Sequence, residues 1–233
     1  FYVARTGRPG PVLIDFPKDI QLSVQDEAPD YDPPMNLPGY HPEDDFKIDK
    51  RAVQDAAKLI MQSRRPVILA GHGAMIARAD KELMKLAETL NCPVTSTLLG
   101  KGVFPETHRL SLGMLGMHGT AYANKAIVEC DCIIGKPAMF GRNATIVHFD
   151  IDEAEAGKMV KPDAFIKGDA KAALQELMPH LSELDTRGWN EHLDGYKRKY
   201  PLGYKKQGGL RMQQVIDELY QLTKGKAIVS TDV

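Results

Sequence analysis

The sequence predicts an α/β fold of three layers, in which a mostly parallel sheet of about six strands lies between helices. Short apolar runs bounded by glycine, proline or polar residues alternate with segments whose apolar residues recur every three or four positions. The runs are typical of strands covered on both faces, and the spaced segments are typical of helices with one buried face. Regular alternation of the two indicates βαβ units and hence a parallel sheet.

The expected elements follow one another through the middle of the chain. Asp49 is a suitable N-cap for the first long helix, and a strand is expected at 66–71. Further strands are expected at 93–97, 132–134, 145–149 and 164–166. The helical stripes that support this order consist of Val53, Ala56, Ala57 and Ile60, of Leu83, Leu86, Ala87 and Leu90, and of Met212, Val215, Ile216 and Leu219; two more helices are expected up to Glu129 and over 171–181.

The two ends of the chain differ from its middle. An apolar strand is expected at 12–16, and five prolines among acidic residues between 25 and 45 predict an extended linker. We expect a leading stub at 1–24, a Pro-rich acidic linker at 25–48, a central α/β domain at 49–183, a helical connector at 184–226 and a last strand at 227–233. A chain that opens and closes inside such units is expected to be a piece of a larger protein.

Composition excludes several classes of function. Of the 233 residues, 43% are hydrophobic and 26% charged, and the net charge of -1 gives no electrostatic case for nucleic acid or for a membrane. No apolar run reaches the roughly 20 residues that span a bilayer. Three cysteines make no disulfide framework, which favours a reducing cytoplasm. Cys130 and Cys132 are poorly spaced for zinc and are interpreted as small core residues.

Ligands of parallel sheets bind beyond the carboxyl ends of the strands, so the loops that follow the strands are the candidates. In Gly71-His72-Gly73-Ala74-Met75, glycines would let backbone N–H groups approach an anionic group, or they could simply make a tight turn. The next strand ends on Thr95-Ser96-Thr97 and not on an acid, which disfavours an ordinary NAD site.

Two later loops combine glycine with aliphatic side chains. Thr97-Leu98-Leu99-Gly100-Lys101-Gly102 suits a flat apolar ligand but is equally compatible with a surface loop. Gly113-Met114-Leu115-Gly116-Met117-His118-Gly119 is richer, because Met and Leu can pack on a ring system and His118 can bond a carbonyl. The alternative is a Met-rich turn in which His118 caps the following helix.

Acidic residues end the last two strands of the predicted sheet. Asp150 lies in His148-Phe149-Asp150-Ile151-Asp152, and Asp169 lies in Gly168-Asp169-Ala170. Such an acid can bind ribose hydroxyls. For Asp169 the alternative is a helix N-cap worth about 1 kcal/mol. No Ser-His-Asp or Cys-His arrangement and no paired carboxylate site is discernible.

Taken together, four segments resemble one family over nearly the whole chain. They are Gly-Arg-Pro-Gly-Pro-Val-Leu-Ile-Asp at 7–15 with Pro-Lys-Asp at 17–19, the loop at 113–119, the segment at 148–152, and Gln-Gly-Gly-Leu-Arg at 207–211. This combination resembles the large catalytic subunit of acetolactate synthase (acetohydroxyacid synthase), a family of thiamine-diphosphate transferases in branched-chain amino-acid biosynthesis.

The resemblance implies a fold and a cofactor. It places 1–24 in the tail of a pyrimidine-binding domain, the middle in a Rossmann-like central domain of the DHS-like NAD/FAD-binding kind, and 227–233 in the first strand of a pyrophosphate-binding domain. It implies that the central domain holds FAD without net redox work, and that thiamine diphosphate and Mg²⁺ bind outside this chain. The FAD contacts that it implies are Arg8, Gly71, Gly73, Ala74, Thr97, Leu98, Leu99, Leu115, Gly116, Met117, His118, Asp150, Ile151, Asp169 and Ala170.

This chain departs from the family pattern in two ways. The family's cofactor-activating glutamate would precede Phe1 and its Gly-Asp-Gly motif would follow Val233, so the chain carries no catalytic residue and is expected to be inactive alone. Family members also carry about a dozen more residues after the position of Gly135. We expect that loop in the natural protein, with the printed sequence closing over it before Lys136, and we expect a site that lacks the loop to be empty of FAD.

The resemblance also implies partners: the other two domains, a second catalytic subunit in a homodimer or tetramer, and a regulatory small subunit. It implies a bacterial-type cytoplasmic enzyme that condenses pyruvate with pyruvate or 2-oxobutyrate and releases carbon dioxide. One alternative is a non-catalytic nucleotide-binding or scaffold domain of another thiamine enzyme that has lost FAD. The other is a dinucleotide oxidoreductase, which the missing acid after the second strand disfavours.

Overall fold

The computed structural model describes residues 1–24, 28, 37, 47–136, 141, 143–204 and 208–230. Its centre is a six-stranded sheet in the order β3-β2-β1-β4-β5-β6, in which all neighbours are parallel. The strands are β1 (Pro66–Ala70), β2 (Val94–Ser96), β3 (Ser111–Met114), β4 (Cys132–Gly135), β5 (Thr145–Asp150) and β6 (Ala164–Lys167). The predicted three-layer α/β fold with about six strands is therefore confirmed.

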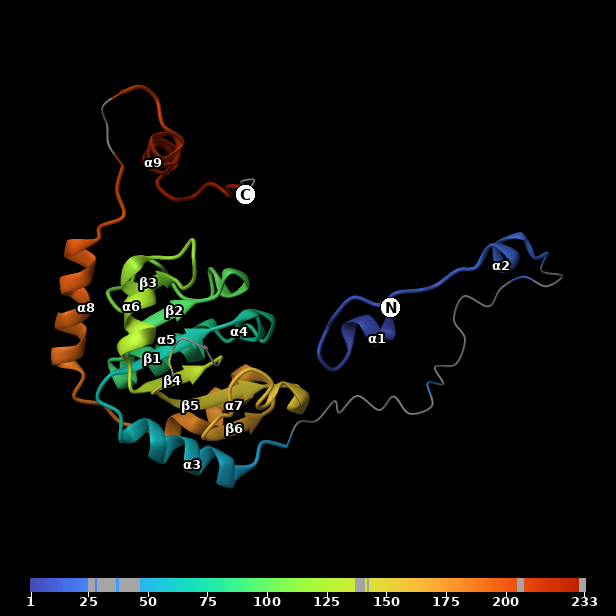
Figure 1. The fold of residues 1–233 in the computed structure, drawn as a ribbon, viewed down its shortest axis with the longest axis horizontal. Helices are drawn as coiled ribbons and strands as arrows, with labels where there is room; N and C mark the ends of the chain where they lie inside the picture. The colour runs from blue at the N-terminus through green and yellow to red at the C-terminus, as the bar shows by residue number, and fades with distance from the viewer. Residues whose placement is uncertain are drawn as a thin grey trace.

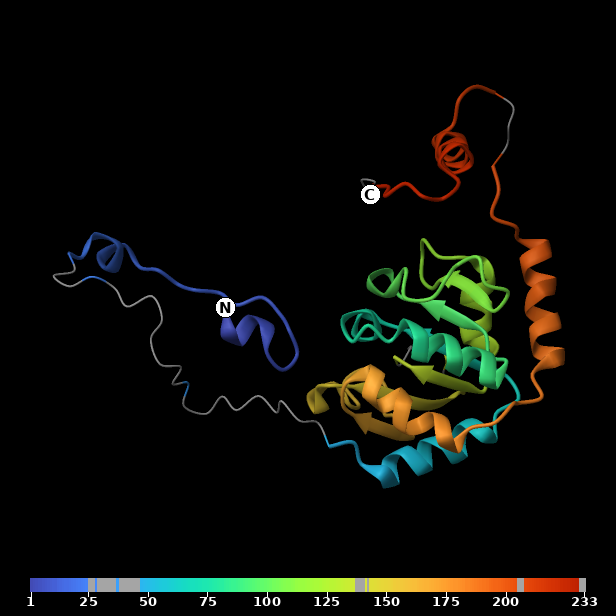
Figure 2. The same cartoon turned by 180° about the vertical axis from the view of Figure 1, so that it is seen from behind.

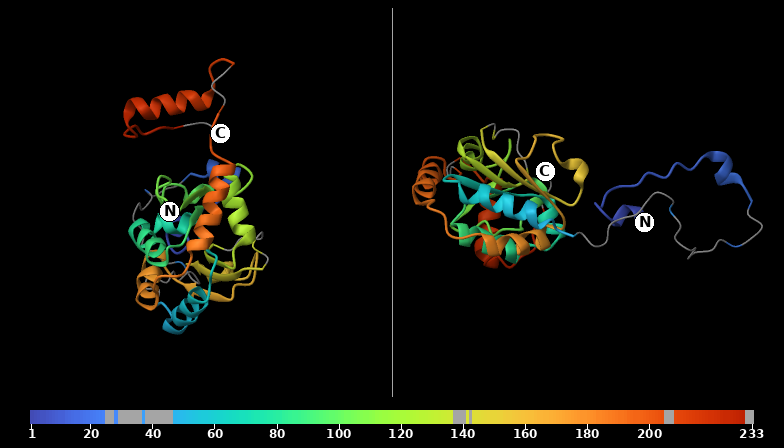
Figure 3. Two further views of the ribbon diagram at one scale, coloured as in Figure 1. Left: turned by 90° about the vertical axis from the view of Figure 1, so that its left-hand side faces the viewer. Right: turned by 90° about the horizontal axis from the view of Figure 1, so that it is seen from below.

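Helices cover both faces of the sheet (Figures 1 and 2). One face carries α3 (Lys50–Met61), α5 (Asp80–Leu90) and α7 (Ala170–Leu177), and the other carries α6 (Ala121–Glu129) and α8 (Arg187–Lys199). The side views in Figure 3 show α6 and α8 together on their face. The remaining described helices are α1 (Tyr2–Arg5), α2 (Lys18–Leu22), α4 (His72–Ile76), α9 (Met212–Thr223) and the short 3₁₀ turns η1 (Leu98–Gly100), η2 (Glu153–Glu155) and η3 (Met178–His180).

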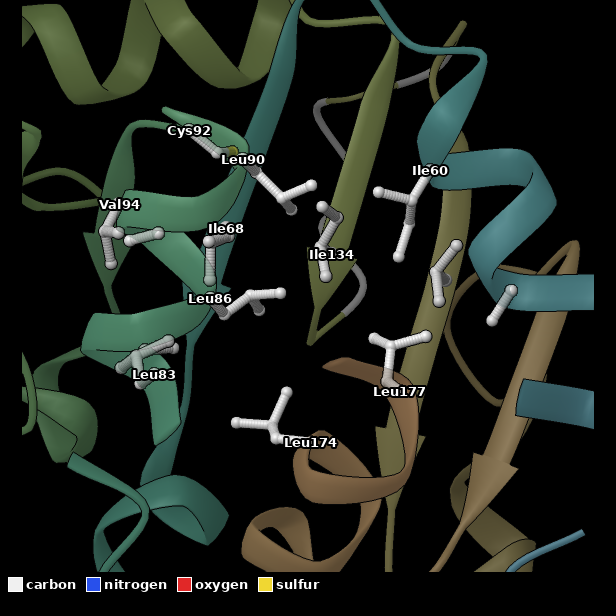
Figure 4. Close-up of a cluster of buried hydrophobic side chains, with 14 of the residues drawn as sticks. Ile60, Ile68, Leu83, Leu86, Leu90, Cys92, Val94, Ile134, Leu174 and Leu177 are labelled. Atoms are coloured by element: carbon white, nitrogen blue, oxygen red, sulfur yellow. The ribbon is translucent and has the colours of Figure 1, made fainter. Parts of the chain in front are cut away.

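Strand alternation divides the interior into two cores. Ile68 of β1 and Ile134 of β4 face the core under α3, α5 and α7, which Figure 4 shows in close-up. Their neighbours Leu69 and Ile133 face the second core, under α6 and α8. Successive side chains of a strand point to opposite faces. An unbroken apolar strand is therefore required to fill both cores, and this is why the strands read as continuous apolar runs.

Local signals place the helix ends. The Asp49 side chain accepts from the N–H of Arg51 at 2.8 Å and caps α3, as predicted. Asn91 ends α5 in the left-handed region at φ 49°, and the N–H of Cys92 returns to the carbonyl of Ala87. The Thr120 hydroxyl accepts from the N–H of Ala123 at the start of α6. The predicted stripes of α3 and α5 are the buried residues of these helices.

The second face is closed by one aromatic anchor. Trp189 of α8 is 5% exposed, and its Nε1 donates to the carbonyl of Pro66 at 3.1 Å. Because Pro66 begins β1, this bond ties α8 to a central strand of the sheet. All three cysteines are free and buried, in keeping with the prediction of small core residues, and burial raises the pKa of the Cys130 thiol to about 12.

The structure corrects several element predictions. β3 was missed, because Ser-Leu-Gly-Met places only one large apolar side chain, Leu112, in the core. The predicted strand at 12–16 is wrong: these residues have no regular structure and are exposed, since no described strand pairs with them. Residues 227–230 likewise form no strand, and 231–233 lie outside the described residues. α7 ends at Leu177, earlier than predicted, where the turn containing Pro179 begins.

Two further points concern the ends of the central unit. The predicted linker at 25–48 lies mostly outside the described residues, and the predicted helical connector at 184–226 contains α8 and α9. The apolar stripe of α9 has no buried residue, whereas α8 packs into the second core. Among the helices of the described part of the chain, none has the length and apolar character to cross a bilayer.

Candidate functional site

The candidate site is the strand-end edge, which we define as the loops that follow the six strands at their carboxyl ends. Register brings these ends into one row: Ser96 pairs with Ala70 and with Met114, Gly135 pairs with Leu69, and Asp150 pairs with Lys167. The strand order reverses between β1 and β4, because the chain runs from β1 toward β3 on one side and from β4 toward β6 on the other. Ligands of open parallel sheets bind at this switch point.

The turn after β1 holds three of the predicted residues. Gly71 precedes α4, and Gly73 and Ala74 lie within it. A Cβ on Gly73 would meet no atom within 4 Å, and one on Gly71 would touch only the side chain of Lys136. Packing within the chain therefore does not require glycine at either position. The sterically required glycine is Gly100, whose Cβ would lie 2.4 Å from the carbonyl oxygen of Ala70.

The loop after β2 presents two aliphatic side chains to solvent. The Thr97 hydroxyl accepts from the N–H of Gly100 at 3.2 Å and fixes the 3₁₀ turn η1. Gly100 is the buried residue of this turn, while Leu98 and Leu99 are 65% and 63% exposed. Two large adjacent aliphatic side chains left in water are unfavourable and indicate a surface that something else covers.

The loop after β3 is held tightly and presents Met117 in the same way. Asn124 of α6 clamps Gly116 twice, accepting from its N–H and donating to its carbonyl, both at 2.9 Å. A Cβ on Gly119 would lie 2.2 Å from the carbonyl oxygen of Met114, so only glycine closes this loop. Met117 is 90% exposed. Leu115 is half-buried, with its N–H donating to the carbonyl of Ser96, and His118 is exposed.

The loop after β5 gathers carboxylates. Asp150 is half-buried, and its Oδ1 accepts from the N–H of Asp152 at 3.0 Å. Its Oδ2 lies 3.6 Å from Nε2 of His148, which is too long for a hydrogen bond and is an electrostatic contact. Burial raises the pKa of the Asp150 carboxyl, but His148, the N–H of Asp152 and the charge of Arg8 together hold that pKa below its usual value. Ile151 is half-buried beside this carboxylate.

His148 itself is a buried polar group with an open position. It is 3% exposed, its ring meets the edge of Phe165 at 5.3 Å, and Nδ1 has no hydrogen-bond partner within the described chain. A buried acceptor or donor without a partner costs about 1–3 kcal/mol. This orphaned atom lies one residue from the edge, under the start of the loop that carries Asp150.

The start of α7 settles one of the open alternatives. The Asp169 side chain caps α7 by accepting from the N–H of Ala172 at 3.0 Å, and Ala170 is the first helical residue. The N-cap interpretation is thus confirmed. The preceding N–H of Gly168 donates to the carbonyl of Asp150, which ties this turn to the loop after β5.

Arg8 reaches the same region from the N-terminal arm, residues 1–24. Its Nη1 lies 2.5 Å from Oε1 of Glu155 and 3.5 Å from Oδ2 of Asp152. Arg8 and Asp150 are therefore brought close together. His118 follows β3 at the other half of the edge, and none of the contacts described for it or for them joins it to Arg8 or Asp150. The predicted residues thus share one edge but form two groups, an aliphatic one after β2 and β3 and an acidic one after β5 and β6.

Two open grooves lie away from this edge. One, of about 910 Å³, lies at the opposite ends of β1 and β4 between the turn after α3 and the start of α8, beside Trp189 and His192. The other, of about 520 Å³, lies between α5 and α7. Neither groove is lined by a predicted site residue, so the strand-end edge is identified by its residues and not by a deep cavity.

Comparison with known proteins identifies the family. The family model described as "Thiamine pyrophosphate enzyme, central domain" matches residues 53–177, which is more than half of the chain. The chain belongs to the thiamine pyrophosphate enzymes. The matched region begins in α3 and ends with α7, so this family domain is the six-stranded unit described above.

Curated relatives confirm the resemblance to acetolactate synthases. The chain is 42% identical to "Acetolactate synthase 1, chloroplastic" of Zea mays and to "Acetolactate synthase 2, chloroplastic" of Nicotiana tabacum, in both cases over all of its length. It is 46% identical to the "Probable acetolactate synthase large subunit" of Methanocaldococcus jannaschii over 85% of its length. The chain spans 39%, 37% and 36% of these relatives, that is, less than half of each.

The alignment with the maize relative bears on the expected loop after Gly135. It runs over 251 positions, 18 more than the 233 residues of this chain. In this thiamine enzyme domain Lys136 follows Gly135 directly, and its N–H donates to the carbonyl of Leu69 at 3.1 Å. Residues 137–140 and 142 lie outside the described residues. The expectation of a longer loop in the natural protein therefore stays a prediction.

Sequence reasoning missed the residues that position the predicted ones. Asn124 clamps the loop after β3 from within a helix, and Glu155 holds Arg8 from a 3₁₀ turn. No local pattern marks either residue, because each acts on a segment that is distant in sequence or reached only through the fold. His148 was quoted as part of a motif, but its burial could not be read from its spacing.

Proposed function

We propose that this chain is the central domain of an acetolactate synthase large subunit and that its strand-end edge holds FAD. The observation that carries the proposal is the division of the edge. Leu98, Leu99 and Met117 form an exposed aliphatic surface after β2 and β3, while Asp150 and Asp169 lie after β5 and β6. A flavin dinucleotide has the same division, with a flat ring system at one end and a ribose with hydroxyl donors at the other.

The residues fit this cofactor chemically. Aliphatic and sulfur-containing side chains pack well on planar rings. An ionised carboxylate accepts strongly from ribose hydroxyls, and the lowered pKa of Asp150 keeps it ionised at neutral pH. Arg8 supplies a positive charge at an otherwise acidic loop, where a diphosphate group needs one. The orphaned Nδ1 of His148 provides an unused hydrogen-bonding position nearby.

In the proposed parent enzyme, pyruvate condenses with pyruvate or 2-oxobutyrate, and thiamine diphosphate with Mg²⁺ supplies the carbanion chemistry. The role of this chain is then to bind and orient FAD as a structural cofactor, and the chain alone is expected to be inactive. The proposed partners are the other domains of the subunit, a second catalytic subunit and a regulatory subunit, in a cytoplasmic enzyme. The segments 1–24 and 227–233 would belong to the neighbouring domains.

Equilibrium titration with FAD, followed by flavin fluorescence, tests this proposal. We expect saturable one-to-one binding, and we expect Asp150→Asn to weaken it about tenfold or more, because a hydrogen bond to a charged group contributes about 1.5–3 kcal/mol. Asp55→Asn is the matched control: Asp55 is an exposed carboxylate on α3 that pairs with Lys58. It should leave the affinity unchanged.

Two outcomes would contradict the proposal. Absence of saturable FAD binding by the folded protein would favour the alternative of a scaffold domain that has lost the cofactor. Binding that Asp150→Asn and Asp55→Asn affect equally would place the cofactor elsewhere. Hydride transfer with NAD is not expected, because β2 ends on Ser96 and offers no acid for the ribose of NAD.

A further inference from the structure

An ion-paired contact joins two segments that are far apart in the chain. Arg8 of the N-terminal arm and Asp152 of the loop after β5 are 144 positions apart, and Nη1 of Arg8 lies 3.5 Å from Oδ2 of Asp152. The same nitrogen lies 2.5 Å from Oε1 of Glu155. Figure 1 shows α1 and the turn that follows it beside the part of the central domain that contains β5 and β6.

The loop that receives Arg8 is arranged by its own hydrogen bonds. The Asp152 side chain caps η2 by accepting from the N–H of Ala154 at 2.9 Å through Oδ1, which leaves Oδ2 for Arg8. Asp150 fixes the backbone of Asp152. Lys158 donates to Oε1 of Glu155 at 2.8 Å, so the second carboxylate is held as well. Carboxylates fixed in this way lose little freedom when they bind a guanidinium.

The charges of the loop favour a cation. Three carboxylates, those of Asp150, Asp152 and Glu155, lie within one turn of chain after β5, and their mutual repulsion is relieved by a neighbouring positive group. The hydrogen bonds from Lys158 and then from Arg8 hold the pKa of Glu155 below its usual value. The hydrogen bond with Glu155 is also the main cause that raises the pKa of Arg8.

We propose that Glu155, together with Asp152, is a positioning residue that docks the N-terminal arm onto the central domain by holding Arg8. Docking places a guanidinium next to Asp150 and so completes the acidic half of the strand-end edge. Only this last step rests on the proposed FAD site, because the docking itself is a property of the chain without any cofactor.

Mobility of the arm tests the proposal directly. The native cysteines are buried, so Val3→Cys, at an exposed position of α1, gives a single reactive thiol for a fluorescent dye. We expect a high dye anisotropy in the labelled protein, a fall on adding salt, and the same fall in Glu155→Gln without salt. An exposed ion pair predicts a change of about two- to fivefold in the ratio of docked to free arm.

Glu153→Gln is the matched control, because Glu153 lies in the same turn but is 3.5 Å from Lys167 and makes no described contact with Arg8. It should keep the anisotropy and the salt response of the parent. Equal anisotropy in Glu155→Gln and Glu153→Gln, with unchanged circular dichroism, would overturn the proposal, and so would a parent anisotropy that ignores salt. These readouts need no FAD, so they decide the docking even if FAD binding fails.

Discussion

Replacing Gly135 with alanine is expected to lower the free energy of unfolding by about 3 kcal/mol or more. Gly135 ends β4 at φ 120°, a region that L side chains rarely adopt. Its Cβ would lie 2.4 Å from the carbonyl oxygen of Leu69, the residue with which it pairs in β1. That oxygen belongs to the backbone of a central strand, so relief requires β1 and β4 to separate at the switch point.

Gly157→Ala separates the two causes of this effect. Gly157 has φ 80°, but a Cβ there would meet no atom within 4 Å, so only the backbone conformation is penalised. We expect a loss of about 1–2 kcal/mol for this control. Urea unfolding followed by circular dichroism measures both values. Equal losses for the two variants would show that the close approach of β1 and β4 at Gly135 is not as described.

Replacing Trp189 with alanine is expected to destabilise the protein by about 3–5 kcal/mol. The indole is buried in the second core with Leu69 and Ile133, and its Nε1 is the donor that satisfies the carbonyl of Pro66. Truncation therefore leaves a cavity and an unpaired carbonyl at the start of a central strand. Trp189→Phe keeps most of the ring but loses the donor, and we expect about 1–2 kcal/mol for it.

Tyr196→Phe is the control on the same helix. The Tyr196 hydroxyl donates to Glu129 at 2.8 Å on a partly exposed face, so we expect a loss of about 1 kcal/mol or less. Thermal unfolding followed by circular dichroism avoids the need for a tryptophan signal, which is lost in the Trp189 variants. A Trp189→Ala variant as stable as Tyr196→Phe would mean that α8 does not anchor the second core.

The main elements of the central domain could be predicted because single residues report local physics. The stripe from Val53 to Ile60 identifies one buried face of a helix without any tertiary information. The run of five buried residues in β1 likewise identifies a strand covered on both faces. β3 escaped detection because Gly113, at φ 68°, and Met114 resemble a loop, and only the ladder to β2 makes them a strand.

The candidate site was predictable only in part, for a related reason. The parallel sheet alone implies that loops after strands meet at one edge, and Leu98, Met117 and Asp150 do lie there. Which side chain fixes which loop depends on packing between distant segments. Asn124 and Glu155 act across such distances, so the sequence carries no local mark of their roles.

Amide hydrogen exchange with and without FAD tests the central claim, that the strand-end edge is one surface for this cofactor. The account predicts slower exchange on both sides of the switch point, at 71–76, 97–100 and 115–118 on one side and at 150–155 on the other. It predicts no change in the turn at 61–65 at the opposite edge of the sheet. Slower exchange confined to that opposite edge, or saturable FAD binding that leaves the strand-end loops unchanged, would contradict the account.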